Sequence, residues 1–189
     1  MAMKLLLHVC CGPCTLYPLT LLRDEGLSPS GFFYNPNIHP FLEFRRRIEA
    51  LDSLSAAMAF PVQVVREYGL TEYLRQVVFH EEERCLRCYE MRLAAAAARA
   101  RESGVDAFTT TLLYSRYQKH ETIRAIGERI GRESGVPFYY RDFREGWQQG
   151  IELSRAMGLY RQPYCGCVYS EQERYDKKNR RQNEPAAGE

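Results

Sequence analysis

The sequence predicts an α/β fold, a parallel sheet with helices on both faces, built as one domain. Short apolar runs that favour strands alternate with longer segments whose apolar residues recur at helical spacing. Strands and helices that alternate in this way are typical of βαβ units, which set parallel strands side by side. The chain has 189 residues, of which 45% are hydrophobic, and this is enough for one domain with a packed core.

Five short apolar runs are the expected strands. They lie at residues 4–10, 31–34, 61–65, 107–111 and 138–140. The first run is almost continuously apolar from Leu5 to Val9, as a buried parallel strand should be. Ligands of such sheets bind at the carboxyl ends of the strands, so we expect the chemistry beside Cys10, Asn35 and Thr111.

Seven helical segments are expected between and after these strands. They lie at residues 15–24, 41–59, 71–78, 85–103, 120–132, 147–157 and 170–179. The run from Ala94 to Ala98 favours the longest of them, and Gly104 is well placed as its end. We expect the domain to cover residues 1–182 and residues 183–189 to form a disordered tail.

Targeting and charge signals are weak. The apolar stretch from Leu5 to Val9 is too short for a signal peptide or a membrane span, so we expect a cytoplasmic protein without a membrane partner. Neither G-x-x-x-x-G-K-[ST] nor G-x-G-x-x-G occurs, so nucleotide hydrolysis has no support. The formal net charge is only +2, but two basic clusters either face phosphates or form solvated surface. They are Arg45, Arg46 and Arg47, and Arg174, Lys177, Lys178, Arg180 and Arg181.

The seven cysteines need a chemical explanation. Their number is odd, and seven in 189 residues is well below the roughly 8 to 10% of a disulfide scaffold. In a reducing cytosol, clustered cysteines are more often metal ligands or redox catalysts than structural bridges. They form three tight groups: Cys10, Cys11 and Cys14; Cys85 and Cys88; Cys165 and Cys167.

The first two groups suit one metal site. Cys10, Cys11 and Cys14 lie where a strand meets a helix N-terminus, which favours thiolate. The C-x-x-C spacing of Cys85 and Cys88 lets both sulfurs turn toward one point. Soft sulfur donors select zinc, copper(I) or an iron–sulfur cluster, and spacing alone does not choose between them.

The third group and one rival motif point to redox chemistry. A disulfide between Cys165 and Cys167 would close a small strained ring and be easily reduced, which favours a redox relay over a structural bridge. Cys11 and Cys14 also match the motif of a thioredoxin-like dithiol oxidoreductase, although Cys10 and the second C-x-x-C pair argue against it. A third hypothesis is a zinc-stabilised tRNA-binding module without catalysis, favoured by the converging thiols and the basic clusters.

Six ordered motifs give the chain a family resemblance. They are His8-Val9-Cys10-Cys11-Gly12-Pro13-Cys14, Phe33-Tyr34-Asn35-Pro36-Asn37-Ile38-His39-Pro40, Arg84-Cys85-Leu86-Arg87-Cys88-Tyr89, Phe108-Thr109-Thr110-Thr111-Leu112, Asp142-Phe143-Arg144 and Leu159-Tyr160-Arg161-Gln162-Pro163-Tyr164-Cys165-Gly166-Cys167. From about Leu5 to Ser170 the sequence resembles the QueH-type epoxyqueuosine reductases. The resemblance implies a fold akin to the PP-loop, HUP-like nucleotide-binding domains without their ATP motifs. It also implies cobalamin-independent reduction of epoxyqueuosine to queuosine at the wobble position of tRNA, with an unidentified electron donor.

The resemblance further implies roles for all seven cysteines. It assigns a [4Fe-4S] cluster to Cys10, Cys11, Cys85 and Cys88, and a redox-active disulfide to the group at 165 and 167. An additional iron ion is implied beside the cluster, with Cys14 as its ligand.

Proton donors and RNA contacts are expected among polar and aromatic residues in or near these motifs. Candidate proton donors are His8, His39, Tyr114, Asp142 and Tyr164. Candidate stacking and phosphate-binding residues are Phe33, Tyr34, Tyr114, Tyr117, Tyr160 and Tyr164, with Arg116, Lys119 and Arg161 between them.

Overall fold

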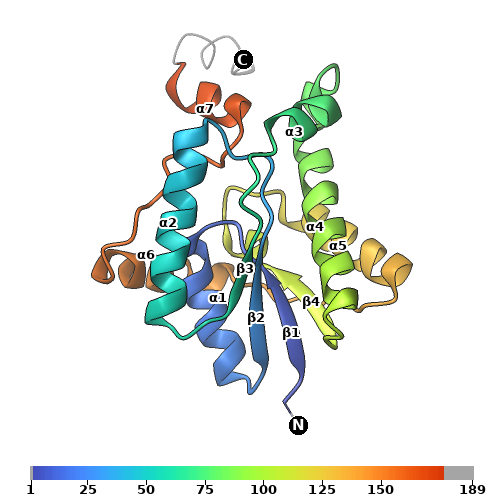
Figure 1. Cartoon of the computed structure of the whole chain (residues 1–189), viewed down its shortest axis with the longest axis vertical. Coiled ribbons are helices and arrows are strands. Elements are labelled where there is room, and N and C mark those ends of the chain that lie inside the picture. The colour runs from blue at the N-terminus through green and yellow to red at the C-terminus, as the bar shows by residue number, and fades with distance from the viewer. Residues whose placement is uncertain (1, 177–189) are drawn as a thin grey trace, which may run out of the picture.

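A four-stranded parallel sheet forms the centre of the chain. The computed structural model describes residues 2–176. The strands are β1 (Lys4–His8), β2 (Ser28–Phe33), β3 (Val62–Val64) and β4 (Ala107–Thr110), in the order β3-β2-β1-β4. All three neighbouring pairs are parallel, with Leu7 opposite Gly31 on one side and Thr109 on the other. The predicted fold class is confirmed (Figure 1).

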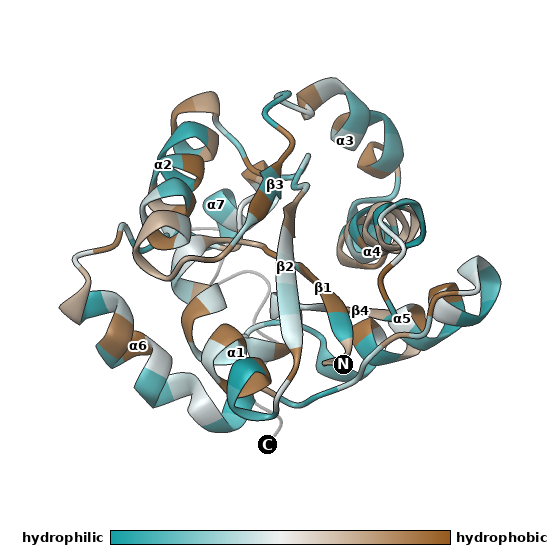
Figure 2. Cartoon of the chain, turned by 60° about the horizontal axis from the view of Figure 1, so that its bottom comes forward, coloured by the Kyte–Doolittle hydropathy of each residue, from teal (hydrophilic) through white to brown (hydrophobic). Residues whose placement is uncertain are grey.

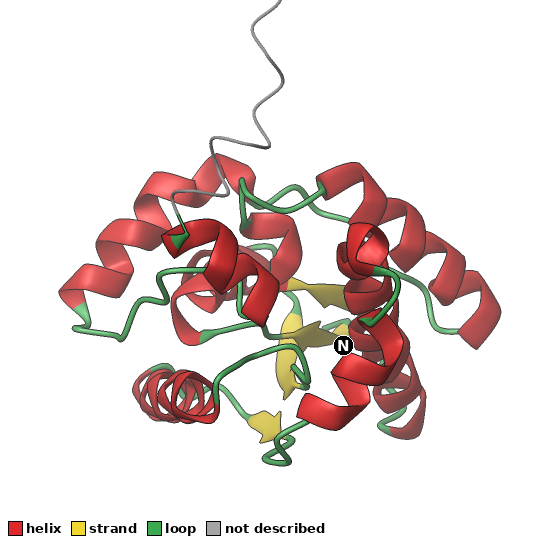
Figure 3. Cartoon of the chain, turned by 90° about the horizontal axis from the view of Figure 1, so that it is seen from above, coloured by secondary structure: helices red, strands yellow, loops and turns green. Residues whose placement is uncertain are grey.

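The described part of the chain contains seven α-helices and three short 3-10 helices. Seen from above, helices lie around the sheet (Figure 3). The α-helices are α1 (Gly12–Asp24), α2 (Phe41–Ala57), α3 (Leu70–Val77), α4 (Arg84–Glu102), α5 (His120–Ser134), α6 (Trp147–Ala156) and α7 (Val168–Tyr175). The 3-10 helices are η1 (Glu81–Glu83), η2 (Thr111–Tyr114) and η3 (Arg144–Gly146). Among residues 2–176, no helix is long and apolar enough to span a bilayer.

The helices cover both faces of the sheet. Helices α1, α2 and α6 lie on one side, and α4 and α5 lie on the other (Figure 1). The chain steps outward from β1 to β3 and then returns to place β4 against the free edge of β1. Because parallel crossovers are right-handed, this reversal of direction moves the connecting helix to the opposite face.

The reversal also fixes where a ligand can bind. In open parallel sheets, the crevice lies outside the carboxyl ends of the two strands between which the order reverses. Here those strands are β1 and β4. The backbone N–H of Cys10, just beyond β1, donates to Thr111 Oγ1, just beyond β4, at 3.0 Å. The first cysteine group therefore lies at this crevice.

Small and apolar side chains pack the helices against the sheet. Leu5, Leu7 and Val9 are fully buried, and each such side chain stabilises the fold by roughly 1.5–3 kcal/mol. Ala96 and Ala100 of α4 are also buried, and they let this helix approach β1 and β4 closely. Hydrophobic and hydrophilic residues alternate along the surrounding helices, so each helix turns one face inward (Figure 2).

Several predicted elements differ in the structure, among them the second strand, which runs from Ser28 to Phe33 rather than over residues 31–34. The expected strand at residues 138–140 is wrong: Phe138 forms only an isolated bridge with Phe108. The chain leaves β4 there because Tyr139 and Arg141 both bond the carboxylate of Glu25 at the end of α1, at 3.0 and 3.1 Å.

The first strand and helix also have other bounds than predicted. Strand β1 ends at His8, and α1 begins at Gly12 rather than at residue 15, with Pro13 in its first turn, where the missing N–H of proline costs nothing. Cys14 is therefore part of the helix. The last helix ends at Tyr175, and the predicted tail and the basic residues from Lys177 onward lie outside the described residues.

Candidate metal and redox site

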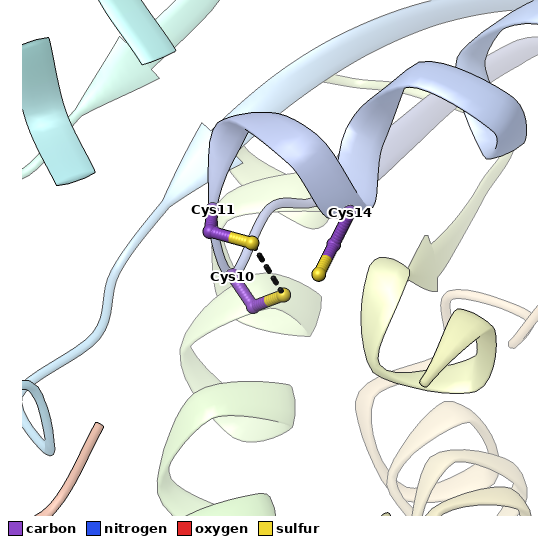
Figure 4. Close-up of side chains that lie close together, drawn as sticks. All are labelled: Cys10, Cys11 and Cys14. Carbon is purple, nitrogen blue, oxygen red and sulfur yellow. Dashed lines mark hydrogen bonds between the residues drawn. The ribbon is translucent and has the colours of Figure 1, made fainter. Parts of the chain in front are cut away.

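Cys10, Cys11 and Cys14 bring three sulfurs together at the start of α1. All three Sγ atoms lie within 4.8 Å of one another, and those of Cys10 and Cys11 are 3.8 Å apart. Cys10 and Cys11 come from the turn after β1, while Cys14 projects from the first helical turn toward the same space (Figure 4). Among the described residues, this is the one group of three or more Cys, His, Asp or Glu side chains with metal-ligand spacing.

Two polar side chains hold these sulfurs in place. Thr111 Oγ1 donates to Cys10 Sγ at 3.2 Å. Gln162 Nε2 donates to Cys11 Sγ at 2.8 Å and approaches Cys14 Sγ at 3.4 Å. Gln162 comes from the loop between α6 and α7, so it ties this loop to the cysteine group.

The electrostatics of the group favour one thiolate. Hydrogen bonds from Cys11 and then Cys14 lower the pKa of Cys10 well below its usual value, and Arg92 and Thr111 act in the same direction. Hydrogen bonding to Cys10 raises the pKa of Cys14, while burial raises that of Cys11. Of the three thiols, that of Cys10 is therefore the one that loses its proton most readily.

Cys85 and Cys88 lie on the first turns of α4. Cys88 is buried with Tyr73, Val77 and Cys167 in a small cluster of its own. Burial raises the pKa of Cys88 to about 12 and also raises that of Cys85. The structure does not bring either sulfur within 4.8 Å of all members of the first group.

Arg92 lies between the cysteine groups. Its side chain is buried, and its Nη1 donates to Cys88 Sγ at 3.7 Å. Its charge also acts on Cys10 and Cys165. One guanidinium thus faces sulfurs from three segments that are far apart in sequence.

The third cysteine group sits on the loop before α7. Cys165 is exposed and accepts a hydrogen bond from Gln118 Nε2 at 3.2 Å. Cys167 is buried at the N-cap of α7, where its sulfur accepts the N–H of Ser170 at 3.3 Å. Gly166 between them has a φ of 148°, a conformation that favours glycine. Both thiols are free in the structure.

A cavity of ≈ 560 Å³ opens beside the cysteines, a size typical of small-molecule sites. Cys10, Cys14 and Cys165 all line it. Its other walls combine aromatic rings with positive charge, and Glu173 is the acidic member. The aromatic and basic lining residues are Tyr114, Tyr117, Trp147, Tyr164, Arg47, Arg92, Arg161 and Arg174.

The candidate proton donors differ in their position, hydrogen bonds and pKa. Tyr114 and Tyr164 line the cavity, but their hydroxyls donate to backbone oxygens of Trp147 at 2.9 Å and His39 at 2.5 Å. Asp142 is held by Arg144, whose hydrogen bonds lower its pKa to about 2, so it is a poor acid. Burial lowers the pKa of His8 to about 3 and that of His39 to about 4, so both rings are neutral at pH 7.

The aromatic residues expected to contact RNA differ in how far their side chains are exposed. Phe33 is fully buried in the core, and the hydroxyl of Tyr34 bonds Glu72. Tyr117 is 85% exposed at the cavity, beside Trp147 with ring centroids 5.6 Å apart. Tyr160 is tied to the carboxylate of Glu43.

The first basic cluster does not face solvent as a unit. Arg47 is buried and pairs with Glu43 at 2.7 Å, and it donates to the backbone oxygens of Cys165 and Tyr164 at 2.7 and 3.0 Å. Arg45 is exposed and pairs with Glu49. Sequence reasoning missed the inward role of Arg47 and the sulfur contacts of Arg92, Gln118 and Gln162, because an isolated Arg or Gln carries no spacing signal.

The chain is similar in sequence to proteins of one family. A sequence model described as "QueH: Epoxyqueuosine reductase QueH" matches residues 5–173. Proteins named epoxyqueuosine reductase QueH are 42% identical in Dehalococcoides mccartyi, covering 95% of this chain and 98% of the relative, and 37% identical in Thermotoga maritima, covering 91% and 92%. A third, from Histophilus somni, is 34% identical over 88% of this chain and 72% of the relative.

A solved structure supports the fold alone. The crystal structure of a predicted subunit of a tRNA methyltransferase from Methanocaldococcus jannaschii matches with a TM-score of 0.54 and 11% identity, covering 81% of this chain and 74% of the other. At this identity the likeness describes the arrangement of strands and helices and no activity. Together, the family match over most of the chain and the close relatives show that the protein belongs to the QueH family of epoxyqueuosine reductases.

Proposed function

We propose that the protein reduces the epoxide of epoxyqueuosine to the alkene of queuosine at the wobble position of tRNA, without cobalamin and in the reducing cytoplasm. The proposal rests on one observation above all: the sulfurs of Cys10, Cys11 and Cys14 converge beside a cavity of ≈ 560 Å³ in a chain of this family. The reaction requires two electrons and two protons, and it releases the epoxide oxygen as water.

The residues present fit an iron–sulfur centre. Sulfur-only donors of this kind suit iron–sulfur clusters, and the buried cation of Arg92 suits an anionic centre. We assign a [4Fe-4S] cluster to Cys10, Cys11, Cys85 and Cys88, and an additional iron ion to Cys14. When bound, such a centre supplies electrons one at a time, and iron acts as a Lewis acid toward the oxygen that leaves.

Cys165 and Cys167 supply the stored electron pair in this proposal. Oxidation of the two thiols to a disulfide releases two electrons and two protons, which balances conversion of the epoxide to the alkene and water. The exposed Cys165 lines the cavity, while Cys167 is buried at a helix N-terminus. An electron donor of the dithiol or flavin class then restores the thiols.

The cavity suits a nucleoside that has been turned out of an RNA loop. Proteins grip such bases by stacking on aromatic rings and bind the flanking phosphates with Arg or Lys. Tyr114 and Trp147 supply rings, and Arg161 and Arg174 supply positive charge in the same cavity.

Anaerobic purification followed by metal analysis tests the proposal. We expect a brown protein with roughly four or more irons per chain, which converts epoxyqueuosine in tRNA to queuosine when given a chemical reductant. A colourless protein that holds one zinc and does not turn over would contradict it and favour a zinc-stabilised RNA-binding module.

The cysteine variants separate the proposal from a thioredoxin-like dithiol enzyme. Such an enzyme uses Cys11 and Cys14 and keeps its activity when Cys85 and Cys88 are replaced by alanine. We expect these two replacements to remove iron and activity together. Cys165→Ala and Cys167→Ala should keep the iron and lose multiple turnover.

A further inference from the structure

Arg92 is a buried cation without a carboxylate partner. Its side chain is 2% exposed, and within residues 2–176 it forms no ion pair with Asp or Glu. Its Nε atom has no hydrogen-bond partner, and Nη1 contacts only the sulfur of Cys88. Burying an unpaired charge is costly, so such a group persists where an anion faces it.

Arg47 provides the comparison within the same site. It is equally buried, but its charge is balanced by Glu43 at 2.7 Å, and its remaining donors reach backbone oxygens of the loop before α7. The fold thus supplies a carboxylate where an arginine holds a loop. Among the described residues it supplies none for Arg92, whose Nη1 instead donates to the sulfur of Cys88.

The sulfurs around Arg92 come from three different segments. Cys88 lies one turn before it on α4, and helical side chains lean toward the N-terminus, so the guanidinium reaches back to this sulfur. Its charge acts on Cys88, Cys10 and Cys165. These three residues belong to the three cysteine groups, and Cys10, Arg92 and Cys165 line the same cavity.

We propose that Arg92 is a positioning residue that acts as the counter-ion of the sulfur centre and raises its reduction potential. The proposal rests on the iron–sulfur function proposed above. A cluster held by four thiolates is anionic and becomes more so with each added electron, so a fixed cation nearby favours the reduced form. Net charge and hydrogen bonds to sulfur are among the factors that set cluster potentials.

Replacement of Arg92 by Gln and by Lys tests this role. Arg92→Gln keeps a polar side chain and removes the charge, while Arg92→Lys keeps the charge and loses the planar fork. Arg99→Gln is the matched control, because it removes one positive charge from the partly exposed face of the same helix. Each protein is loaded with iron and sulfide under anaerobic conditions and titrated against redox mediators, with the reduced cluster measured by electron paramagnetic resonance.

We expect Arg92→Gln to lower the equilibrium constant for reduction of the cluster at least tenfold. In a one-electron couple this is a fall of about 59 mV in the reduction potential. For Arg92→Lys this equilibrium constant should stay within tenfold of the wild-type value. Arg99→Gln should have the wild-type value. A cluster-loaded Arg92→Gln with the wild-type potential would overturn the proposal. So would equal loss of iron from the Gln and Lys variants when both fold, since charge would then not be the property that matters.

Loss of iron or of folding in the Arg92 variants also tests the proposal. If Arg92→Gln folds but loses its iron while Arg92→Lys retains it, the counter-ion role is supported. If Arg92→Gln and Arg92→Met both fail to fold without metal while Arg92→Lys folds, the charge serves the fold and the proposal fails. Failure of the wild-type protein to take up iron at all would instead refute the proposed function, and it is seen before any variant is made.

Discussion

Gln162 shows how a single amide can tune the cysteine group. Its Nε2 donates to Cys11 and approaches Cys14, while its Oε1 is buried without a partner. The amide thus offers its donor side to sulfur. Hydrogen bonds to thiolate ligands stabilise their negative charge and tune the metal they hold.

We expect Gln162→Glu to impair metal binding. A carboxylate has acceptors only and carries negative charge, so it would repel the sulfurs that Gln162 now bonds. Iron content after anaerobic reconstitution should fall by at least half. Gln148→Glu is the control, because Gln148 lies on the exposed side of α6, where its amide bonds Glu152. Equal iron content in both variants would show that the contact to sulfur does not matter.

His39 makes stability depend on pH. Its ring is buried between Tyr68 and Tyr73, with centroids 5.6 and 5.2 Å away, and burial lowers its pKa from 6.5 to about 4. Between these values the unfolded chain binds the proton and the folded chain does not. The contribution of His39 is therefore complete above pH 6.5 and is lost as the pH falls toward 4.

We expect His39→Phe to flatten this dependence. The wild type should lose about 2 kcal/mol of its free energy of unfolding from this group between pH 7 and pH 5. The variant keeps an aromatic ring and cannot titrate, so its loss should be smaller by this amount. Urea unfolding of the metal-free protein at both pH values measures the difference, and identical losses would refute the role of His39.

The grouping of Cys10, Cys11 and Cys14 could be predicted from sequence, and the side chains that bond these sulfurs could not. Grouped thiols stand out because cysteine is rare and its spacing reflects ligand geometry. Gln162 contacts a residue 151 positions away, and Arg47 contacts a backbone oxygen 118 positions away. Contacts of this kind are set by the crossing of loops and helices, which no local pattern encodes.

At the scale of elements, the loop before α7 is held by helix α2. Arg47 of α2 bonds the backbone oxygens of Tyr164 and Cys165, and Glu43 balances its charge. Tyr160 of the same loop donates to the second oxygen of Glu43 at 2.5 Å. The buried ion pair therefore positions the segment that carries the third cysteine group.

Replacing Arg47 and Glu43 should show whether their ion pair serves stability, activity or both. Arg47→Met alone leaves Glu43 buried and unpaired, which costs about 3–5 kcal/mol of the free energy of unfolding. The double variant Arg47→Met with Glu43→Leu should recover most of that stability, because both charges are gone. Its turnover should stay low, since the loop carbonyls still lack their donor. Wild-type turnover in the stable double variant would show that the pair serves stability alone.

Most elements follow from the sequence because their signals are local. The apolar spacing of α2, α4 and α5 predicts each of these helices with bounds close to those observed. The apolar run at residues 4–10 predicts β1, although this strand ends earlier, at His8. The failures occur where tertiary contacts compete with local preference. Residues 138–140 have strand-like side chains, but the bonds of Tyr139 and Arg141 to Glu25 draw the chain away from β4.

At the scale of the molecule, two almost fully exposed aromatic residues differ in their surroundings. Tyr117 is 85% exposed and Phe79 is 91% exposed. Tyr117 lies at the cavity, where Arg116 sits 5.9 Å from the ring of Trp147. Phe79 lies before η1, whose three residues are all glutamates. RNA carries negative charge, so only the first of these sites suits it.

We expect Tyr117→Ala to weaken tRNA binding and Phe79→Ala to leave it unchanged. Loss of base stacking on an aromatic ring costs about 1–3 kcal/mol, which is roughly a 5- to 160-fold rise in KM. Tyr117→Phe keeps the ring and should keep most of the affinity, while kcat should change little because Tyr117 lies at the rim. Binding of the substrate tRNA is measured at two salt concentrations, together with turnover. Equal losses in Tyr117→Ala and Phe79→Ala, or none in either, would place the RNA elsewhere, because position beside the cavity and positive charge are what distinguish these two exposed rings.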